Sequence, residues 1–517
     1  MRPAPPTGDS TAPDDPVVRA AVEGLGGPLG RHAVRRARFW TPVRWLVLLT
    51  LLTSLVGFWQ KSPCRYHPWA DQYQYTRVCY TDVYALYFAE RLSEGAVPYL
   101  DHPVEYPVVI GAVMGVAAAG AELFPERDRP ARFYDLTWVL LTAAALVVVV
   151  TTARLAGRRP WDAALFALAP ALVLHGTTNW DLVAMALAGL GLLQWARRRP
   201  VVAGVLLGLA TATKLYPLLF LLPIGLLCLR AGRLRAFWPA LVAAVVTPIA
   251  LTLPAYLASP SYAEVDGQQV QVASAPLERF GDAGLSALAP HTSVVLPDGT
   301  TAVGVNSAYR FVELNRTRPA DWDSLWFLLQ TVRGTPLDSG GGAPHLLNAL
   351  VAVLLVAALV GIAVLVLKAP VRPRLPQVLF LVLLAFLLTN KVWSPQFSLW
   401  LVPLFALARP RWRSFLVWQV AEAVLLVTRF LYFVSNGSPG DGIGVNWFLG
   451  AVVVRDAVLV GIAALVVRDV LRPEHDVVRR DGVDDPAGGV LDGAPDRRAV
   501  HDAPPGLPHQ EPSRPLA

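Results

Sequence analysis

The chain has 517 residues, of which 54% are hydrophobic and only 16% are charged, and its net charge is +7 at neutral pH. Soluble globular proteins carry about 25% charged residues, so this composition excludes an ordinary soluble domain and indicates an integral membrane protein. The Lys and Arg residues gather in short clusters between apolar runs, which is typical of membrane orientation rather than of nucleic-acid binding. The sequence also contains no Gly-rich phosphate loop, no zinc-type Cys/His spacing and no Ser-centred nucleophile elbow.

Both ends of the chain are polar. Residues 1–38 are rich in Pro, Ala, Gly and Asp, and residues 472–517 are Pro-rich and carry charges of both signs. Neither segment has enough apolar surface to offset the entropy lost on ordering. We therefore predict two disordered cytoplasmic tails around a transmembrane domain at residues 39–471. The first apolar run, 43–59, starts late and has no small-residue cleavage site, so we interpret it as a retained anchor rather than a signal peptide.

Apolar runs alternate with Lys/Arg clusters along the transmembrane domain, and several runs are shorter than the ~20 residues of an ideal membrane-spanning helix. The sequence predicts an all-α, polytopic membrane protein in which these runs are helices. They are residues 43–59, 106–124, 134–153, 161–175, 181–196, 201–213, 215–229, 236–257, 346–367, 374–389, 397–408, 413–434 and 445–467.

The Lys/Arg clusters mark the cytoplasmic side, so consecutive clusters should be separated by an even number of crossings. This rule fails only near the start, where 43–59, 106–124 and 134–153 lie between two clusters. We expect 106–124 to be juxtamembrane or re-entrant, because it is rich in Gly and Ala, contains Glu122 and follows a surface segment. The prediction is about twelve crossings, with both termini in the cytoplasm and a juxtamembrane first outside loop.

Two long loops, 60–107 and 258–323, fall on the extracytoplasmic face together with several short hairpins. Loop 258–323 is rich in Gly, Pro, Ser and Thr, and we assign it no secondary structure; loops of this length are commonly functional or disordered. In loop 60–107, a disulfide between Cys64 and Cys79 would close about fifteen residues and contribute ~3 kcal/mol. Two free thiols remain an open alternative.

Asp82 opens a short amphipathic segment that ends at Gly95 and suits a helix at the membrane surface. Asp is a favoured N-cap residue, so a helix cap is the simplest role for Asp82. A carboxylate at the boundary between water and lipid also suits a general base that accepts a proton from a hydroxyl. Glu105 and Tyr106 follow in the same loop, where Glu105 can simply stabilise the start of the next helix.

Two lysines, Lys214 and Lys391, lie in short outside hairpins between apolar runs. A Lys in such a place is energetically expensive and rarely faces lipid, although it can also snorkel to the interface. Arg132 lies on the outside, against the charge bias, and is a candidate anion ligand. These cations share a face with several carboxylates, which indicates a site that holds an anion such as a lipid phosphate and activates a neutral hydroxyl.

Asn179 and Asp181 open the run 181–196, and His175 lies one turn earlier. Taken singly, Asn179 or Asp181 is better explained as a helix cap than as a ligand. Their place on the outside face makes them candidates for the same site.

Six short motifs, taken in their order and spacing, resemble glycosyltransferase family 87, a family of GT-C-type membrane proteins. The family includes actinobacterial mannosyltransferases that use polyprenol-phosphate-mannose, and the resemblance covers roughly residues 40–470. The motifs are Thr81-Asp82-Val83-Tyr84, Gly95 with Pro98-Tyr99, Glu105-Tyr106-Pro107, Asn179-Trp180-Asp181, Thr213-Lys214-Leu215-Tyr216-Pro217, and Asn390-Lys391 with Ser394-Pro395-Gln396 and Trp400.

The resemblance implies a GT-C-like fold and an inverting reaction, in which an acceptor hydroxyl deprotonated by Asp82 attacks the anomeric carbon of a sugar and displaces polyprenyl phosphate. It implies mannose as the sugar and a cell-envelope glycolipid or glycan as the acceptor. Lys214 and Lys391 would contact the phosphate. Many GT-C enzymes have two acidic residues in the first-loop motif and can bind a metal; here Asp82 has non-acidic neighbours, so we predict no metal and no other cofactor. The other predicted substrate-binding residues are Glu105, Tyr106, Arg132, His175, Asn179, Asp181, Tyr216, Asn390 and Gln396.

A transporter or flippase of lipid-linked sugars is the main alternative, because it would also need buried Lys and Asp residues. Transporters commonly show internal repeats and polar sites in the middle of broken helices, whereas here no repeat is evident and the polar residues lie at the ends of the runs. A non-catalytic scaffold would leave Asp82, Lys214 and Lys391 scattered. We therefore predict a plasma-membrane enzyme with an extracytoplasmic active site.

Overall fold

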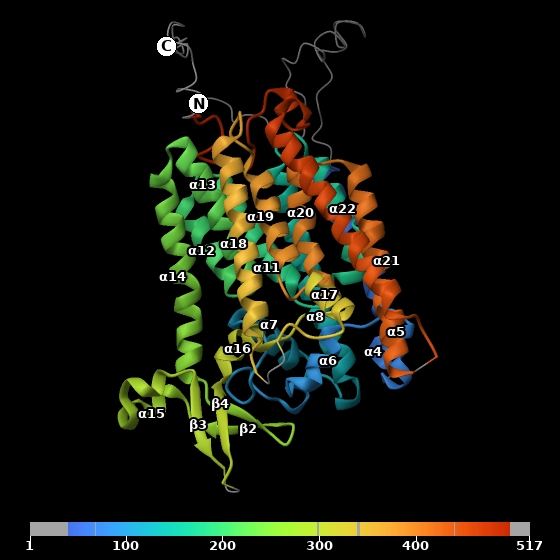
Figure 1. The fold of residues 1–517 in the computed structure, drawn as a ribbon, viewed down its shortest axis with the longest axis vertical. Coiled ribbons are helices and arrows are strands. Elements are labelled where there is room, and N and C mark those ends of the chain that lie inside the picture. The colour runs from blue at the N-terminus through green and yellow to red at the C-terminus, as the bar shows by residue number, and fades with distance from the viewer. Residues whose placement is uncertain (1–39, 68, 297–298, 339–341, 439, 497–517) are drawn as a thin grey trace, which may run out of the picture.

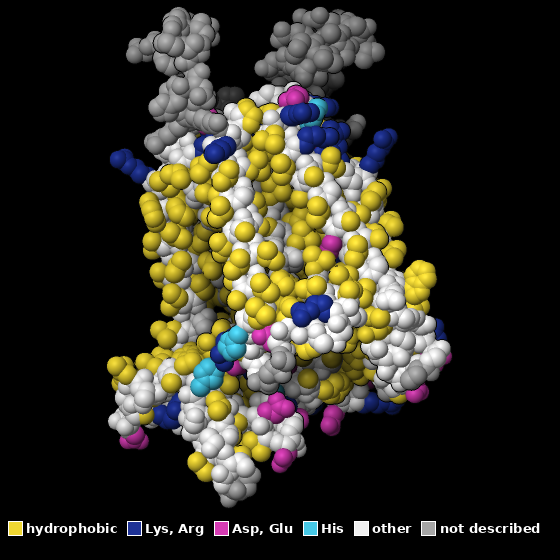
Figure 2. Space-filling view, in the orientation of Figure 1, with side chains coloured by type: hydrophobic (Ala, Val, Ile, Leu, Met, Phe, Trp, Pro, Cys, Tyr) yellow, Lys and Arg dark blue, Asp and Glu magenta, His cyan; other side chains and the backbone are white. Residues whose placement is uncertain are grey.

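The computed structural model describes residues 40–67, 69–296, 299–338, 342–438 and 440–496, so the predicted tail at 1–38 lies outside the described residues. Long helices form a bundle, and a small domain of strands and short helices extends from one end of it (Figure 1). Figure 2 shows a broad belt of hydrophobic side chains around the bundle, with Lys and Arg side chains gathered at the end opposite the small domain.

Each predicted apolar run forms one helix or a series of short helices, which confirms a mainly helical membrane protein. Among the described residues, six helices are long and apolar enough to cross a membrane, whereas the predicted total of twelve crossings stays a prediction. The long helices are α3 (Pro42–Lys61), α8 (Arg129–Leu155), α14 (Leu234–Ala258), α18 (His345–Lys368), α21 (Trp412–Gly437) and α22 (Val445–Leu471). The shorter apolar helices are α7 (Val108–Ala121), α11 (Asp181–Ala196), α12 (Pro200–Thr211), α13 (Leu221–Ala231), α19 (Leu375–Thr389) and α20 (Ser398–Ala408).

Burial separates the centre of the bundle from its lipid-facing edge. Nearly all residues of α19 and α20 are buried, whereas α14 buries only Ala240 and Ala244. A helix that is apolar on all sides is stable either in the core or against lipid, so α14 belongs to the edge. Small residues join α14 to α12, because a Cβ added at Gly204 would lie 2.2 Å from the Ala240 carbonyl oxygen. This close backbone approach is typical of membrane helices.

Loop 60–107, predicted as the first outside loop, is made of short helices. Thr81 caps α6 (Asp82–Ala89) by accepting a hydrogen bond from the Val83 amide, and after a 3-10 turn Gly95 ends the segment with a φ of 82°. Cys64 and Cys79 form a disulfide with their Cα atoms 5.6 Å apart, so the alternative of two free thiols does not hold. The other short helices of the loop are α4 (Pro63–Tyr66), η1 (Ala70–Gln72), α5 (Tyr73–Thr76) and η2 (Leu92–Glu94).

The run predicted at 161–175 is broken into η4 (Pro160–Ala163), α9 (Ala164–Ala167) and α10 (Pro170–His175). Prolines at the starts of η4 and α10 favour these breaks, because proline fits the first turn of a helix but not its interior. The turn after α10 carries Thr177, Thr178 and Asn179 towards α6, where the Thr178 carbonyl accepts a hydrogen bond from the Asp82 amide at 2.9 Å. Similar short turns, η3 (Glu126–Asp128), η5 (Tyr216–Phe220) and η8 (Pro395–Phe397), precede α8, α13 and α20.

Loop 258–323, to which we assigned no secondary structure, forms an antiparallel four-stranded sheet in the order β2-β1-β4-β3. The sheet adds a small β component to the predicted all-α fold. Its strands are β1 (Ser261–Val265), β2 (Gln268–Ala273), β3 (His291–Val295) and β4 (Thr301–Asn306). The helices within and after the sheet are α15 (Pro276–Ala283), η6 (Gly284–Leu288), η7 (Ser307–Tyr309), α16 (Arg310–Thr317) and α17 (Leu325–Arg333).

The prediction of a disordered tail at 472–517 does not hold for residues 472–496, which pack on the end of the bundle opposite the sheet and include η9 (Pro473–His475) and η10 (Arg479–Asp481). Asp476 is buried, and its carboxylate accepts hydrogen bonds from Arg374 at 2.7 and 3.0 Å. The carboxylates of this segment pair with arginines of the bundle, and these ion pairs order it. Such ion pairs cannot be recognised from the low apolar content of the segment.

Candidate active site

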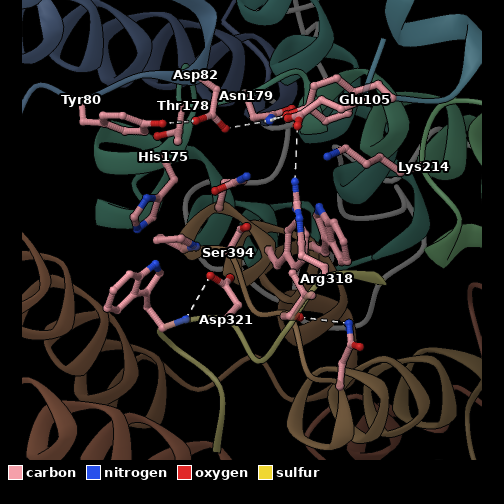
Figure 3. A pocket seen from close by; sticks show the side chains of 18 of the residues that line it. Tyr80, Asp82, Glu105, His175, Thr178, Asn179, Lys214, Arg318, Asp321 and Ser394 are labelled. Atoms are coloured by element: carbon pink, nitrogen blue, oxygen red, sulfur yellow. Dashed lines mark hydrogen bonds and ion pairs between the residues drawn. The ribbon is translucent and has the colours of Figure 1, made fainter. Parts of the chain in front are cut away.

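A cavity of about 440 Å³ lies where the bundle helices end next to the small domain and meet α16 and the loop that follows it. Figure 3 shows polar side chains from loops 60–107 and 258–323 and from the short hairpins pointing into the same space. Most of the predicted site residues line this cavity. They are Asp82, Glu105, Tyr106, His175, Asn179, Lys214, Tyr216, Asn390 and Gln396.

Asp82 is the first residue of α6, but Thr81 rather than Asp82 caps the helix. The Asp82 carboxylate is therefore free to face the cavity, where one oxygen accepts from the Tyr80 hydroxyl at 2.8 Å and the other from the Asn179 amide at 2.9 Å (Figure 3). Burial and the neighbouring Asp82 carboxylate raise the pKa of Tyr80, so its hydroxyl stays protonated and donates. Because each carboxylate oxygen accepts more than one hydrogen bond, a substrate hydroxyl can still bind to Asp82.

Asn179 is held in place by its neighbours. Its side-chain oxygen accepts from the Trp180 amide at 2.7 Å, and its side-chain nitrogen also donates to the Tyr106 hydroxyl. These contacts fix which way the amide points, so its N–H groups face Asp82 and Tyr106. Asn179 acts here as a bridge between the two outside segments that carry Asp82 and Tyr106.

Lys214 supplies a buried positive charge at one wall of the cavity. Its ammonium nitrogen lies 3.5 Å from a carboxylate oxygen of Asp181, and it lies 4.8 Å from the centre of the Tyr106 ring. The same Asp181 oxygen accepts a hydrogen bond from the Trp400 indole at 2.8 Å. Asp181 therefore lies behind Lys214 and orients it, rather than lining the cavity itself.

Aromatic rings form a platform beside Lys214. The rings of Tyr216 and Trp400 stack with their centroids 4.2 Å apart and their planes at 15°, and Phe397 stacks on Trp400 with centroids also 4.2 Å apart. All three residues line the cavity. Stacked aromatic faces next to a cation suit a ligand that has both apolar faces and an anionic group.

His175 lines the cavity with its imidazole buried. Neither of its ring nitrogens has a hydrogen-bond partner within the described part of the chain. Buried polar atoms are nearly always hydrogen-bonded in native proteins, so the two nitrogens are available to a bound ligand.

The sequence that carries these residues can be compared with known protein families. The model of glycosyltransferase family 87 matches residues 130–395, which is more than half of the chain.

The chain belongs to glycosyltransferase family 87.

The resemblance drawn from the motifs is thus confirmed, and the protein is a multi-pass membrane glycosyltransferase. No curated protein matches the sequence.

Two solved structures are similar to the family 87 chain at low identity. ArnT from Cupriavidus metallidurans, bound to undecaprenyl phosphate, has a TM-score of 0.38 and 14% identity over 83% of this chain and 77% of that chain. The oligosaccharyltransferase of Archaeoglobus fulgidus in its apo form has a TM-score of 0.35 and 12% identity over 83% of this chain. The match spans 56% of the length of the oligosaccharyltransferase.

Besides Asp181, two predicted site residues of the glycosyltransferase do not reach the cavity lining. Arg132 pairs with Asp135 at 3.2 Å near the start of α8, and its side chain is about half-buried. The Lys391 ammonium donates to the Arg316 carbonyl at 3.3 Å, and burial lowers the pKa of Lys391 to about 8. Lys391 fastens the end of α16 next to the cavity, because its hairpin is short and its side chain turns towards α16.

Several cavity residues of the glycosyltransferase were not predicted. Arg318 pairs with Glu105 at 3.3 Å across the two outside loops (Figure 3), and Arg429 projects from α21 and pairs with Asp323 at 2.7 Å. Burial raises the pKa of Asp321 to about 6, against a weaker lowering by Arg429. Lys61, at the end of α3, donates to the Tyr80 carbonyl at 2.8 Å. Arg429 carried a detectable signal, because a charged residue inside an apolar run is a candidate functional residue.

No group of three or more His, Cys, Asp or Glu side chains that could hold a metal ion is found in residues 40–496 apart from the undescribed gaps. The absence of a metal cofactor stays a prediction. In the cavity, Asp82 and Asp321 have different partners: Asp82 accepts from the Tyr80 hydroxyl and the Asn179 amide, and Asp321 accepts from the Trp322 amide at 3.0 Å.

Proposed function

We propose that this glycosyltransferase moves a sugar, namely mannose, from a polyprenyl-phosphate donor to a hydroxyl of a cell-envelope glycolipid or glycan on the extracytoplasmic side, with inversion at the anomeric carbon. One observation carries the proposal: Asp82, held by two neutral donors, and the Lys214 ammonium line the same cavity at the end of a membrane bundle. The cavity thus has a proton acceptor and a cation within one enclosed space.

The reaction that fits this arrangement needs one base and one anion site. The acceptor hydroxyl gives its proton to the Asp82 carboxylate, and its oxygen forms a bond to the anomeric carbon. The bond between that carbon and the phosphate oxygen breaks, and the electron pair leaves with the polyprenyl phosphate. A general base contributes about 10²–10⁴-fold to such a step, and cations placed at the leaving phosphate stabilise the charge that develops there.

Lys214 is the best placed of the lining cations to hold the phosphate. Its ammonium nitrogen lies 5.5 Å from the centre of the Phe397 ring in the aromatic platform, and its ion pair with Asp181 fixes its position. Arg318 and Arg429 also line the cavity, where they pair with Glu105 and Asp323. We give Lys214 the main role at the donor phosphate because it lies beside the aromatic platform.

The placement of the polar residues favours an enzyme over a transporter. Asp82 and Lys214 lie in loops at one end of the bundle, whereas a transporter site is expected near the middle of the membrane. A scaffold is also disfavoured, because Asp82 and Lys214 line one cavity rather than lying apart.

The deciding experiment replaces Asp82 with Asn and measures sugar transfer in membranes from polyprenyl-phosphate mannose to an envelope lipid extract. We expect the D82N variant to lose about 10²–10⁴-fold in rate. The matched control is E94Q, in the same loop, because Glu94 is exposed and pairs with the exposed Arg91. Full activity in correctly folded D82N would remove Asp82 as the base. A parallel assay with polyprenyl-phosphate glucose as the donor shows whether the enzyme transfers mannose or glucose.

A second readout separates the enzyme from a flippase. If the wild-type protein moves lipid-linked mannose across vesicle membranes but transfers no sugar to any acceptor in the extract, the transferase proposal fails and the transporter alternative holds.

A further inference from the structure

The small outside domain exposes a group of large apolar side chains that are not packed against the bundle. They lie on α15 and η6, here called the 276–288 segment, where Leu277 is 68% exposed and Leu285 is 78% exposed. Phe280 and Leu288 are exposed in the same segment. Single exposed apolar residues are common and need no explanation, but four within thirteen residues of an outside loop do.

The 276–288 segment has three distinct sides. With 3.6 residues per turn, Leu277 and Phe280 fall on one side of α15, and Glu278 and Asp282 fall on another. Arg279 points to the third side, where it donates to the Ser274 carbonyl at 2.9 Å and to the Ala287 carbonyl at 3.4 Å. Arg279 thereby fixes the rotation of α15 against the domain.

The segment is attached to the outside end of a lipid-facing helix. The Tyr256 hydroxyl, in the last turns of α14, donates to the Leu288 carbonyl at 2.7 Å. Helix α14 itself exposes a stripe of apolar side chains along its length, at Trp238, Val242, Val246, Ile249 and Leu253. Figure 2 shows hydrophobic side chains over α15 on the side towards the bundle and an acidic side chain on the side away from it.

We propose that the 276–288 segment lies in the headgroup and upper acyl region of the membrane leaflet that faces the small domain, with Leu277, Phe280 and Leu285 among the lipid chains. The apolar side of α15 continues the lipid-facing surface of α14, and its carboxylates point to water, which is how an interfacial amphipathic helix lies. The exposed sides carry Glu278 and Asp282 and no cation, so burial of apolar surface drives the contact. Anionic lipids are not required.

This contact has a consequence for the cavity. The strand β4, which ends at Asn306, leads through Ser307 into α16, and the Ser307 hydroxyl donates to the Tyr99 carbonyl of the first outside loop. Phe311 and Leu314 of α16 line the cavity. A domain held at a fixed height on the lipid surface therefore holds one wall of the cavity at a fixed height.

The test attaches a fluorescent nitrobenzoxadiazole probe to single cysteines in the full-length protein. Cys228 is buried and is replaced by Ala, and Cys64 and Cys79 are joined in a disulfide, so L277C, L285C and the control V295C each provide one reactive thiol. Val295 is 69% exposed, which matches Leu277, but it is the last residue of β3, at the end of the strand that points away from α15 (Figure 1). The protein is reconstituted in phosphatidylcholine vesicles, with and without lipids that carry a doxyl quencher near the headgroup.

We expect the probes in L277C and L285C to emit at shorter wavelength than the probe in V295C. We also expect the doxyl lipids to quench the fluorescence of these two probes. Both results should hold when phosphatidylcholine is the only other lipid, and they should persist at high salt. Quenching by aqueous iodide as strong as in V295C, without quenching by doxyl lipids, would overturn the proposal. So would quenching that appears only with phosphatidylglycerol and disappears in salt. Cross-linking of L285C between two copies by a bismaleimide, with no lipid quenching, would show a second copy as the occupant instead.

Discussion

The buried pair of Lys214 and Asp181 combines a structural task with a chemical one. Breaking a buried ion pair by removing one partner typically costs about 3–5 kcal/mol, because the remaining charge is left without a counterion. We therefore expect K214M to lower the melting temperature of the purified protein and to abolish sugar transfer. This result alone does not separate the two tasks.

The double variant K214M/D181N separates them. With both charges removed, Asn at position 181 can still accept from the Trp400 indole, which now donates to Asp181 at 2.8 Å, and we expect most of the melting temperature to return. Sugar transfer should stay lost, because no cation remains at the phosphate. Wild-type activity in the double variant would show that Lys214 only neutralises Asp181.

Glu90 makes the stability of the first outside loop depend on pH. Burial, followed by the neighbouring Glu105 carboxylate, raises the pKa of Glu90 from 4.5 to about 8. Between these two pH values the folded protein holds a proton that the unfolded chain has released, so the free energy of unfolding falls as pH rises. Each pH unit in this window changes it by about 1.4 kcal/mol.

We expect E90Q, which imitates the protonated side chain and can still accept from the Glu105 amide at its oxygen, to lack this fall. Its melting temperature relative to wild type should therefore increase from pH 5 to pH 8. The exposed E94Q variant should show no such trend. An equal difference at both pH values would mean that Glu90 is ionised in the folded protein.

At the scale of elements, the 472–496 segment acts as a clasp across the end of the bundle opposite the cavity. Asp476 pairs with Arg374 at 2.7 Å, Asp484 with Arg372 at 2.6 Å, and Asp496 with Arg230 at 2.6 Å. These arginines come from or lie next to α13 and α19. The segment therefore joins helices that are far apart in the sequence.

Asp476 is the most connected carboxylate of the clasp, since it also accepts from the Gln377 amide at 3.1 Å. We expect D476A to lower the melting temperature strongly, by the equivalent of about 3–5 kcal/mol, because Arg374 is buried and would lose its counterion. E474Q is the matched control, since Glu474 is exposed two residues earlier. Equal melting temperatures for D476A and wild type would mean that the clasp does not contribute to stability.

Helices were predictable from the sequence, and the other ordered segments were not. An apolar run such as 346–367 has one stable structure in a bilayer, because its backbone must satisfy its own hydrogen bonds there, and it forms α18. Strand β2 alternates Gln with Val over only a few residues, which is too short a pattern to stand out in a loop rich in Gly, Pro, Ser and Thr. The 472–496 segment is ordered by charges whose partners lie more than a hundred residues away.

At the scale of the whole molecule, the positions of the Lys and Arg clusters along the sequence predicted which residues lie at the same end of the bundle. They did not predict which of these residues line the same cavity. Asp82 and Lys214 were placed on one face because both lie at the same ends of apolar runs, and the structure brings them to one cavity. Lys391 lies on the same face, but its side chain turns to α16. Arg429 was missed because it lies inside a run that was treated only as apolar. Side-chain direction, which the sequence does not encode locally, decided the case of Lys391, whereas Arg429 could have been recognised as a charged residue inside an apolar run.

The orientation of the whole protein in the membrane can be tested with single cysteines at the two ends of the bundle. Lys and Arg gather at the end of the bundle opposite the small domain (Figure 2), and loops rich in Lys and Arg stay in the cytoplasm. The cavity and the small domain should therefore lie outside. Single cysteines V295C and E474C, in a chain whose Cys228 is replaced by Ala, mark the two ends.

We expect a membrane-impermeant maleimide added to intact cells to label V295C at once and E474C only after the membrane is permeabilised. Val295 and Glu474 are both exposed, so a difference between them reports the side of the membrane rather than access within the fold. The reverse pattern would place Asp82 and the cavity in the cytoplasm. A polyprenyl-phosphate sugar would then have to be used on the cytoplasmic side, and an envelope acceptor outside the cell could not be reached.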